Sequence, residues 1–176
     1  MSSLKENNVR NRVLSFEEFD KLIKHSPEHL QPILGLAYYT GMRKGEILGL
    51  TWDQVDLKRG WIHLRPEQTK TGEGRKIPLN EKVVKILRSI RKEVGLVFHH
   101  RGRPIKEVRK AFNTACQKAG IEDFLFHDFR HTFVTNMRKA GKQDRAIMAV
   151  TGHKTMSVFM RYDTVDEEDL RKVIEP

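Results

Sequence analysis

The chain has 176 residues, about one domain, and 38% of them are hydrophobic, which is enough for a folded core and excludes a disordered chain. With 33 Lys and Arg against 23 Asp and Glu, its formal net charge is +10. This charge indicates a polyanionic partner, nucleic acid first and an anionic membrane second, or else a solvated basic surface. The single cysteine, Cys116, excludes an internal disulfide and a cysteine-based zinc finger, and no apolar run approaches the roughly 20 residues of a membrane span.

The first segments of the chain predict an arm followed by two helices. Residues 1–14 are polar and basic without periodicity, as in a linker or an N-terminal arm. Ser15 and Glu18 have the spacing of a capping box, so a helix is expected over residues 16–26. The segment 28–41 is apolar enough for a buried helix, and its final glycine suits a left-handed helix end.

The middle of the chain predicts a short helix and a small sheet. The helix is expected over residues 43–50, after which the hydrophobic period changes from helical to extended. Residues 55–64 and 75–79 have the composition of strands, with turns at 58–60 and 71–74. Together they predict a three-stranded antiparallel sheet.

The second half of the chain predicts helices separated by a loop over 98–104 and a turn over 151–155. The helices are expected over residues 80–94, 105–119, 126–141, 141–150, 156–164 and 166–175. The fold class that follows is α+β, mainly α, with one small sheet.

The helix over 126–141 carries several cations near its start. On a wheel of about 100° per residue its cationic and apolar side chains take opposite faces: His127, Arg130, His131 and Arg138 against Phe129, Phe133, Met137 and Ala140. Because the macrodipole already makes a helix N-terminus positive, these charges indicate an anionic ligand.

Taken one at a time, the other candidates have ordinary explanations. Arg43 and Lys70 suit a helix end and a solvated hairpin, His153 suits a turn cap, and Tyr162 suits a core aromatic. His127 and His131 have the i, i+4 spacing of metal ligands, but the Glu of HExxH is missing. No metal and no cofactor are therefore expected.

The order of these residues resembles the tyrosine recombinases, also called the phage integrase family. The pattern is an Arg after a helix and turn, a Lys in a β-hairpin, His-x-x-Arg opening a helix, a Gly-His turn, and a Tyr nine residues after that His. The phrases "LTWDQVDL" and "HDFRHTFVT" support it. The resemblance implies a catalytic domain over 15–176, without the helical core-binding domain that generally precedes it.

The resemblance also implies roles for individual residues. They are two arginines that clasp the scissile phosphate (Arg43 and Arg130), two histidines of the same pocket (His127 and His153), a hairpin lysine (Lys70), the nucleophile (Tyr162) and an acidic residue that supports the first arginine (Glu46). The implied activity is DNA strand exchange through a covalent 3′-phosphotyrosine.

The chemistry of these residue types agrees with such an activity. Two guanidiniums can meet the negative charge that builds on non-bridging phosphate oxygens, and nearby cations favour the phenolate of a tyrosine whose free pKa is about 10. Lys70 can protonate the departing 5′ oxygen. A phosphotyrosine stores the energy of the broken bond, so resealing needs no ATP. Fixed cations replace the divalent ions of two-metal nucleases, so no metal is needed. Which of His127 and His153 accepts the tyrosine proton is left open.

Two other functions are weighed against strand exchange. A type IB topoisomerase-like relaxase would use similar chemistry on one strand, and a decayed, non-catalytic DNA-binding module would use none. The expected partners are double-stranded DNA and, on paired sites, a homotetramer, with a monomer in free solution and a cytoplasmic, nucleoid-associated location. A helix after Tyr162, with Leu170, Val173 and Ile174 on its apolar side, docks either on its own domain or on a neighbouring subunit.

Overall fold

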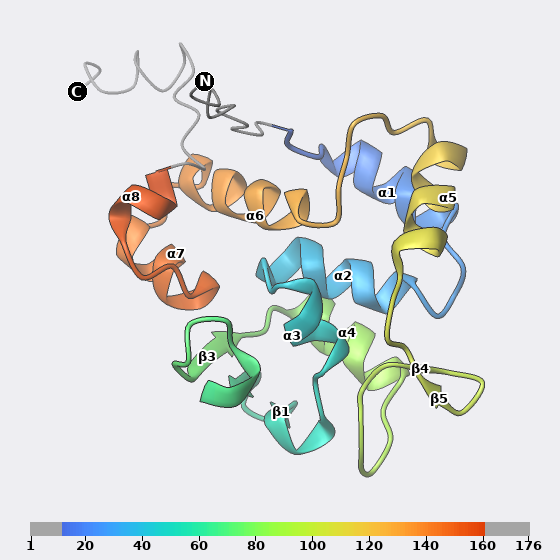
Figure 1. Cartoon of the computed structure of the whole chain (residues 1–176), viewed down its shortest axis with the longest axis horizontal. Coiled ribbons are helices and arrows are strands. Elements are labelled where there is room, and N and C mark those ends of the chain that lie inside the picture. Colours follow the sequence, from blue (N-terminus) through green and yellow to red (C-terminus); the bar gives the residue numbers. More distant parts are fainter. Residues whose placement is uncertain (1–11, 161–176) are drawn as a thin grey trace, which may run out of the picture.

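The computed structural model describes residues 12–160, which are mainly helical (Figure 1). The helices are α1 (Phe16–Lys24), α2 (Gln31–Thr40), α3 (Lys44–Leu48), α4 (Glu81–Ser89), α5 (Arg109–Ala119), α6 (Asp128–Lys139), α7 (Asp144–Thr151) and α8 (Met156–Phe159). The strands are β1 (Val55–Asp56), β2 (Trp61–Leu64), β3 (Arg75–Pro78), β4 (His99–His100) and β5 (Arg103–Pro104). The expected α+β class is confirmed. Tyr162 and the helix expected over 166–175 lie outside the described residues, and within 12–160 no helix is long and apolar enough to cross a membrane.

Two helix ends follow directly from the local sequence. The Ser15 hydroxyl accepts from the Glu18 backbone N–H (3.1 Å), and the Glu18 carboxylate accepts from the Ser15 N–H (2.9 Å), which confirms the capping box of α1. Helix α2 ends at Gly41, whose φ is +62° and where a Cβ would lie 2.7 Å from the Phe133 ring. Any larger residue at Gly41 meets both backbone strain and this ring. The chain therefore turns sharply after α2.

The predicted three-stranded sheet is present in the order β1-β2-β3, with antiparallel pairing throughout. Ile62 pairs with Ile77, and Leu64 pairs with Arg75. Because side chains alternate along a strand, Arg75 lies on the same face of β3 as the buried Ile77. The inner face of this sheet therefore carries one long cation among apolar side chains.

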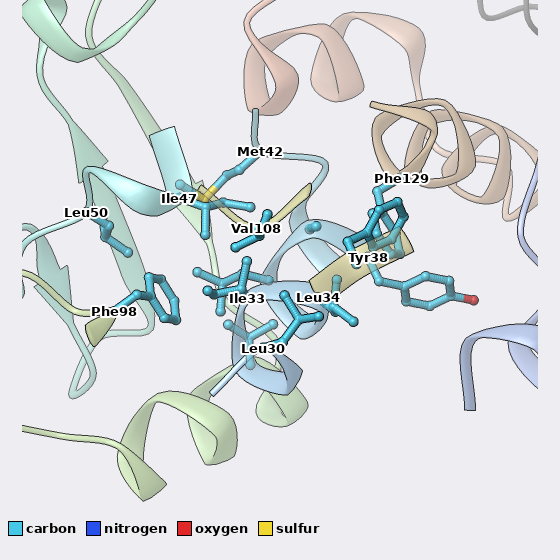
Figure 2. Close-up of a cluster of buried hydrophobic side chains, with 14 of the residues drawn as sticks. Leu30, Ile33, Leu34, Tyr38, Met42, Ile47, Leu50, Phe98, Val108 and Phe129 are labelled. Carbon is cyan, nitrogen blue, oxygen red and sulfur yellow. The ribbon is translucent and has the colours of Figure 1, made fainter. Parts of the chain in front are cut away.

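Helix α2 lies at the centre of the domain and organises the core. Its residues Ile33, Leu34, Leu36 and Ala37 are fully buried, and α6, α4 and α3 pack against it (Figure 1). Figure 2 shows Ile47 of α3, Phe129 of α6 and, from the connecting segments, Leu50 and Phe98 gathered around this helix. Each large apolar side chain buried here contributes about 1.5–3 kcal/mol relative to exposure. The C-terminal end of α2 is consequently a rigid reference point for the segments that meet there.

Helices α4 and α5 each have one end well inside the range that their periodicity predicts. The pattern over 80–94 predicts one helix, but α4 ends at Ser89, because residues 91–93 are charged and exposed and Val94 stays 80% exposed. Helix α5 begins only at Arg109, where the Glu107 carboxylate accepts from the backbone N–H groups that start the helix. The end of α4 and the start of α5 are therefore set by burial and by a local cap, and not by hydrophobic periodicity alone.

The loop expected over 98–104 is wrong, because β4 and β5 form a second, two-stranded sheet there. Arg101 has φ +51° and Gly102 has φ +76°, so both central residues of the two-residue turn lie in the left-handed region. Such turns connect tight antiparallel hairpins. An arginine is unusual in the first of these positions, where Gly, Asn or Asp is expected, so the sequence did not predict a hairpin.

Candidate active site

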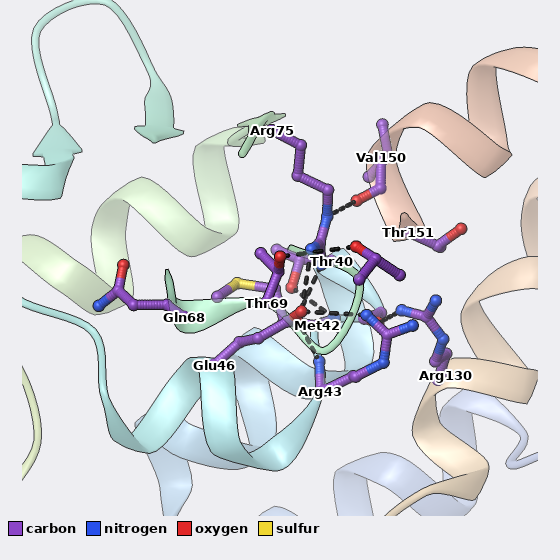
Figure 3. A network of polar contacts seen from close by, with 12 residues as sticks. Thr40, Met42, Arg43, Glu46, Gln68, Thr69, Arg75, Arg130, Val150 and Thr151 are labelled. Carbon is purple, nitrogen blue, oxygen red and sulfur yellow. Dashed lines mark hydrogen bonds and ion pairs between the residues drawn. The ribbon is translucent and has the colours of Figure 1, made fainter. Parts of the chain in front are cut away.

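Several segments that are distant in sequence converge at the C-terminal end of α2 (Figure 3). Arg43 follows the turn at Gly41 and is the N-cap residue of α3. Arg130 comes from the first turn of α6, and His153 follows the end of α7. Lys70 lies in the connection between β2 and β3. The structure thus brings the described sequence candidates to one region of the domain.

Arg130 is the most deeply buried charged side chain of this region, with 1% of its surface exposed. One guanidinium nitrogen, Nη1, donates to the Gly41 carbonyl at 3.0 Å. The other, Nη2, lies 3.2 Å from Nε2 of His153. Arg130 is therefore held by the end of α2 on one side and by the turn after α7 on the other.

The hydrogen bonds around His153 assign its tautomer. The Thr151 hydroxyl donates to the Ile147 carbonyl at 2.7 Å, so it accepts from Nδ1–H of His153 at 2.8 Å. Nε2 then carries no proton and accepts from Arg130. Burial first, and then the positive charge of Arg130, lower the pKa of His153 to about 3. His153 is accordingly a neutral acceptor at neutral pH.

Glu46 is a buried carboxylate, 3% exposed, that joins two arginines. Its two oxygens accept from Arg75 at 2.9 and 2.7 Å, in a forked ion pair. Arg43 donates to it through its backbone N–H at 2.8 Å and through Nη1 at 3.1 Å. Burial alone would raise the pKa of Glu46, but the hydrogen bonds from Arg75 and Arg43 outweigh it, so the pKa lies below its ordinary value. Glu46 is therefore ionised and fixes the backbone at Arg43.

Arg43, Glu46, Arg75, Arg130 and His153 form one polar cluster. His127 and Lys70 lie at its edge and are exposed to solvent. Partial burial, and then the charges of Arg130, Arg43 and Lys70, lower the pKa of His127, so the ring is neutral at neutral pH. The Lys70 connection is tied to the turn after α7 by an ion pair between Glu73 and Lys154, 3.1 Å apart. These two residues are exposed, whereas Arg130 and His153 have little exposed surface and are held by hydrogen bonds.

A pocket of about 490 Å³ opens beside the cluster. Arg43, His127 and Arg130 line one part of it, and Phe112 and Asn113 of α5 line another. Cationic and hydrogen-bonding groups therefore face an accessible space, as an anion site requires. Among residues 12–160, no group of three or more His, Cys, Asp or Glu side chains is arranged to hold a metal ion.

The structure corrects the single cationic face expected for the helix over 126–141. His131 is 2% exposed and burial lowers its pKa, so it belongs to the interior. Arg138 lies near the other end of α6, where its Nε donates to Asp144 at 3.0 Å. Only His127 and Arg130 of that set line the pocket. Tertiary contacts with α2 and α7 separate charges that a helical wheel places together.

Two residues of the cluster were missed at the level of sequence, namely Arg75 and Thr151. The strand alternation that buries Ile77 also places Arg75 inward, and this was the available signal. Thr151 directly precedes the Gly-His turn, but nothing in the sequence indicates that its hydroxyl faces the ring of His153.

Comparison with known proteins extends these observations. The family model described as "Phage integrase family" matches residues 12–169. The integrase of Salmonella phage P22 is 32% identical over 177 residues, which cover 88% of this chain and 44% of that protein. The shufflon-specific DNA recombinase of Escherichia coli is 35% identical over 158 residues, which cover 87% of this chain and 40% of that protein. The chain spans less than half the length of these two curated relatives.

Solved structures show the same fold. The crystal structure of XerA recombinase matches with a TM-score of 0.76 and 26% identity, covering 94% of this chain and 65% of that one. The catalytic domain of bacteriophage HP1 integrase matches with a TM-score of 0.73 and 22% identity, covering 94% of both chains. The second comparison shows the similarity of fold alone.

Proposed function

The chain belongs to the phage integrase family, and we propose that it is the catalytic domain of a site-specific DNA recombinase that cleaves and rejoins strands through a 3′-phosphotyrosine on Tyr162. One observation carries this proposal. Two arginines, Arg43 and Arg130, line the same pocket while separate hydrogen bonds hold each of them in place. Such prearranged donors stabilise the charge that develops on a phosphate under attack.

The arginines act as a fixed seat for the scissile phosphate. Arg130 is already dehydrated and oriented by Gly41 and His153, so little reorganisation is needed when DNA binds. Arg43 keeps 23% of its side-chain surface exposed and directs it into the pocket. Fixed guanidiniums supply the charge that a divalent ion supplies in other nucleases, so the proposed reaction uses no metal.

The geometry favours His127 as the base that accepts the Tyr162 proton. His153 directs Nδ1–H at Thr151 and Nε2 at Arg130, so both of its ring nitrogens are engaged. His127 is exposed at the pocket, and its lowered pKa leaves the ring unprotonated at neutral pH. In this assignment His153 orients Arg130, and His127 handles the proton.

Lys70 is the proposed acid for the departing 5′ oxygen. Its ammonium is exposed on the β2–β3 connection, which can approach a bound strand. The phosphotyrosine conserves the energy of the cleaved bond, so a DNA hydroxyl can reseal the strand without ATP. The proposed partners are double-stranded DNA and further copies of the chain, as a tetramer on paired sites, in the cytoplasm at the nucleoid.

The test is incubation with a nicked duplex that carries the cognate site, so that cleavage releases a short fragment and traps the covalent complex. The wild-type chain is expected to form a DNA adduct that survives denaturation, and Tyr162→Phe is expected to form none while binding DNA with nearly unchanged affinity. Full cleavage by Tyr162→Phe would refute the mechanism. A plasmid assay separates recombination, which joins two sites, from relaxation, which changes only linking number.

A further inference from the structure

Arg75 is a buried cation that the reaction steps above do not use. Only 8% of its side chain is exposed, although it lies on a strand at the edge of the catalytic cluster. Its guanidinium makes the forked pair with Glu46, and its Nε donates to the Val150 carbonyl at 2.8 Å (Figure 3). Burying a guanidinium costs desolvation free energy, which only a well-arranged ion pair and hydrogen bonds can offset. Such a residue is therefore a candidate for a specific structural role.

The contacts of Arg75 join three segments that carry proposed catalytic groups. The residue itself lies in β3, directly after the connection that holds Lys70. Through Glu46 it reaches the start of α3 and the backbone of Arg43. Through the Val150 carbonyl it reaches the last turn of α7, which leads to His153. Arg75 therefore lies in one of these segments and contacts the other two.

The chain packs tightly against Arg75 on the α7 side. Gly152 has φ +74°, and a Cβ built on it would lie 3.1 Å from Nη1 and 3.2 Å from Cζ of Arg75. The glycine thus permits both the left-handed end of α7 and the close approach of the guanidinium. The position of Arg75 and the path of the chain into His153 are consequently linked.

Arg75 also controls how Glu46 interacts with Arg43. Because Arg75 takes both carboxylate oxygens, only Nη1 of the Arg43 side chain bonds to Glu46, and the rest of that guanidinium stays available at the pocket. Without Arg75, the buried carboxylate would hold one cation instead of two and would draw Arg43 into a forked pair. That pair would compete with a phosphate for the same donors.

We propose that Arg75 is a positioning residue for strand cleavage. Its positive charge compensates the charge of the Glu46 carboxylate, so that the Arg43 guanidinium stays available for the phosphate. It also fixes the end of α7, which leads to His153. This inference rests on the proposed function. It assigns no contact with DNA to Arg75.

The test measures the single-turnover rate of cleavage of the nicked cognate duplex at saturating DNA. The DNA concentration at half-saturation and the melting temperature of each variant are measured as well. Arg75→Gln is expected to slow cleavage on the order of 100-fold, the loss that small misplacements of catalytic groups cause, with little change in half-saturation. Arg75→Lys keeps the charge without the fork and is expected to recover part of the rate. The matched control is Arg12→Gln, because Arg12 makes a similar two-point pair with Glu18 away from the cluster. This control is expected to keep the wild-type rate.

The double variant Arg75→Gln/Glu46→Gln separates positioning from general stability. If Arg75 acts by neutralising Glu46, removing that charge as well makes cleavage no slower than in Arg75→Gln alone. The inference would be overturned if the rate losses of the two single variants multiplied in the double variant. A wild-type rate in Arg75→Gln, or an equal loss of rate in Arg12→Gln, would overturn it as well. If Arg75→Gln does not fold, Arg75→Lys decides: a slower rate at an unchanged melting temperature supports the inference, and a wild-type rate overturns it. Failure of the wild-type chain to form any adduct would instead refute the proposed function.

Discussion

Thr151→Val perturbs the cluster through a single hydroxyl. Thr151 is fully buried, and its oxygen is the acceptor for Nδ1–H of His153 at 2.8 Å. Valine fills nearly the same volume but leaves that N–H without its partner, so the proton is expected to move to Nε2, where it faces the donors of Arg130. Arg130 then loses an acceptor that holds its guanidinium toward the pocket.

The size of the effect follows from the hydrogen bond that is lost. With the proton on Nε2, a buried ring N–H faces the donors of Arg130 and has no acceptor, which costs about 1–3 kcal/mol. If this cost appears in the transition state, cleavage slows by about 5-fold to about 150-fold. The loss is expected in the single-turnover rate at saturating DNA, with little change in DNA affinity, because no contact surface or charge is removed.

Thr135→Val is the matched control for this prediction. Thr135 is also buried, 6% exposed, and within residues 12–160 its hydroxyl has no hydrogen-bond partner. The control is expected to keep the wild-type rate and to melt at the same or a higher temperature. A wild-type rate in Thr151→Val, or equal losses in the two variants, would refute the assigned tautomer of His153 and its role in holding Arg130.

Three further predictions concern the cations and the pH response. Arg130→Lys keeps a charge but loses the fork, so we expect cleavage to fall by about 10²–10³, as when an oxyanion donor is removed, and wild-type turnover would contradict this. Lys70→Ala should be rescued by a substrate with a 5′ thiolate leaving group, which needs no proton; absence of rescue removes Lys70 from the acid role. Because the folded-state pKa of His153 is about 3, below its ordinary value of about 6.5, the unfolded chain binds the proton first as pH falls. Stability is therefore expected to decline from about pH 6.5 toward pH 3, less steeply in His153→Asn, as measured by denaturant unfolding; equal slopes would argue against this assignment.

Local chemistry in the sequence was sufficient for much of the fold. The capping box of Ser15 and Glu18 and the left-handed stop at Gly41 depend on neighbouring residues, and both are present. The alternation and turns of the three-stranded sheet are similarly local. The hairpin at Arg101 was not predictable in this way, because its turn uses a residue type that rarely takes a positive φ.

The candidate site was predictable only in its residue types and their order. That Arg130 and His153 lie within hydrogen-bond distance depends on how α6 and α7 pack, which no local pattern encodes. His131 illustrates the same limit, because a helical wheel places it beside Arg130, whereas tertiary packing buries it in the interior. Arg75 was overlooked because a cation on a short strand near a turn usually faces solvent.

The proposed phosphotyrosine mechanism is tested most simply by identifying the side chain that becomes linked to DNA. The wild-type chain is trapped on the nicked cognate duplex, digested with protease and nuclease, and the modified peptide is sequenced by mass spectrometry. We predict a nucleotide 3′-phosphate on Tyr162. Cleavage with no covalent protein–DNA linkage, or a phosphate that maps to a different residue, would contradict it.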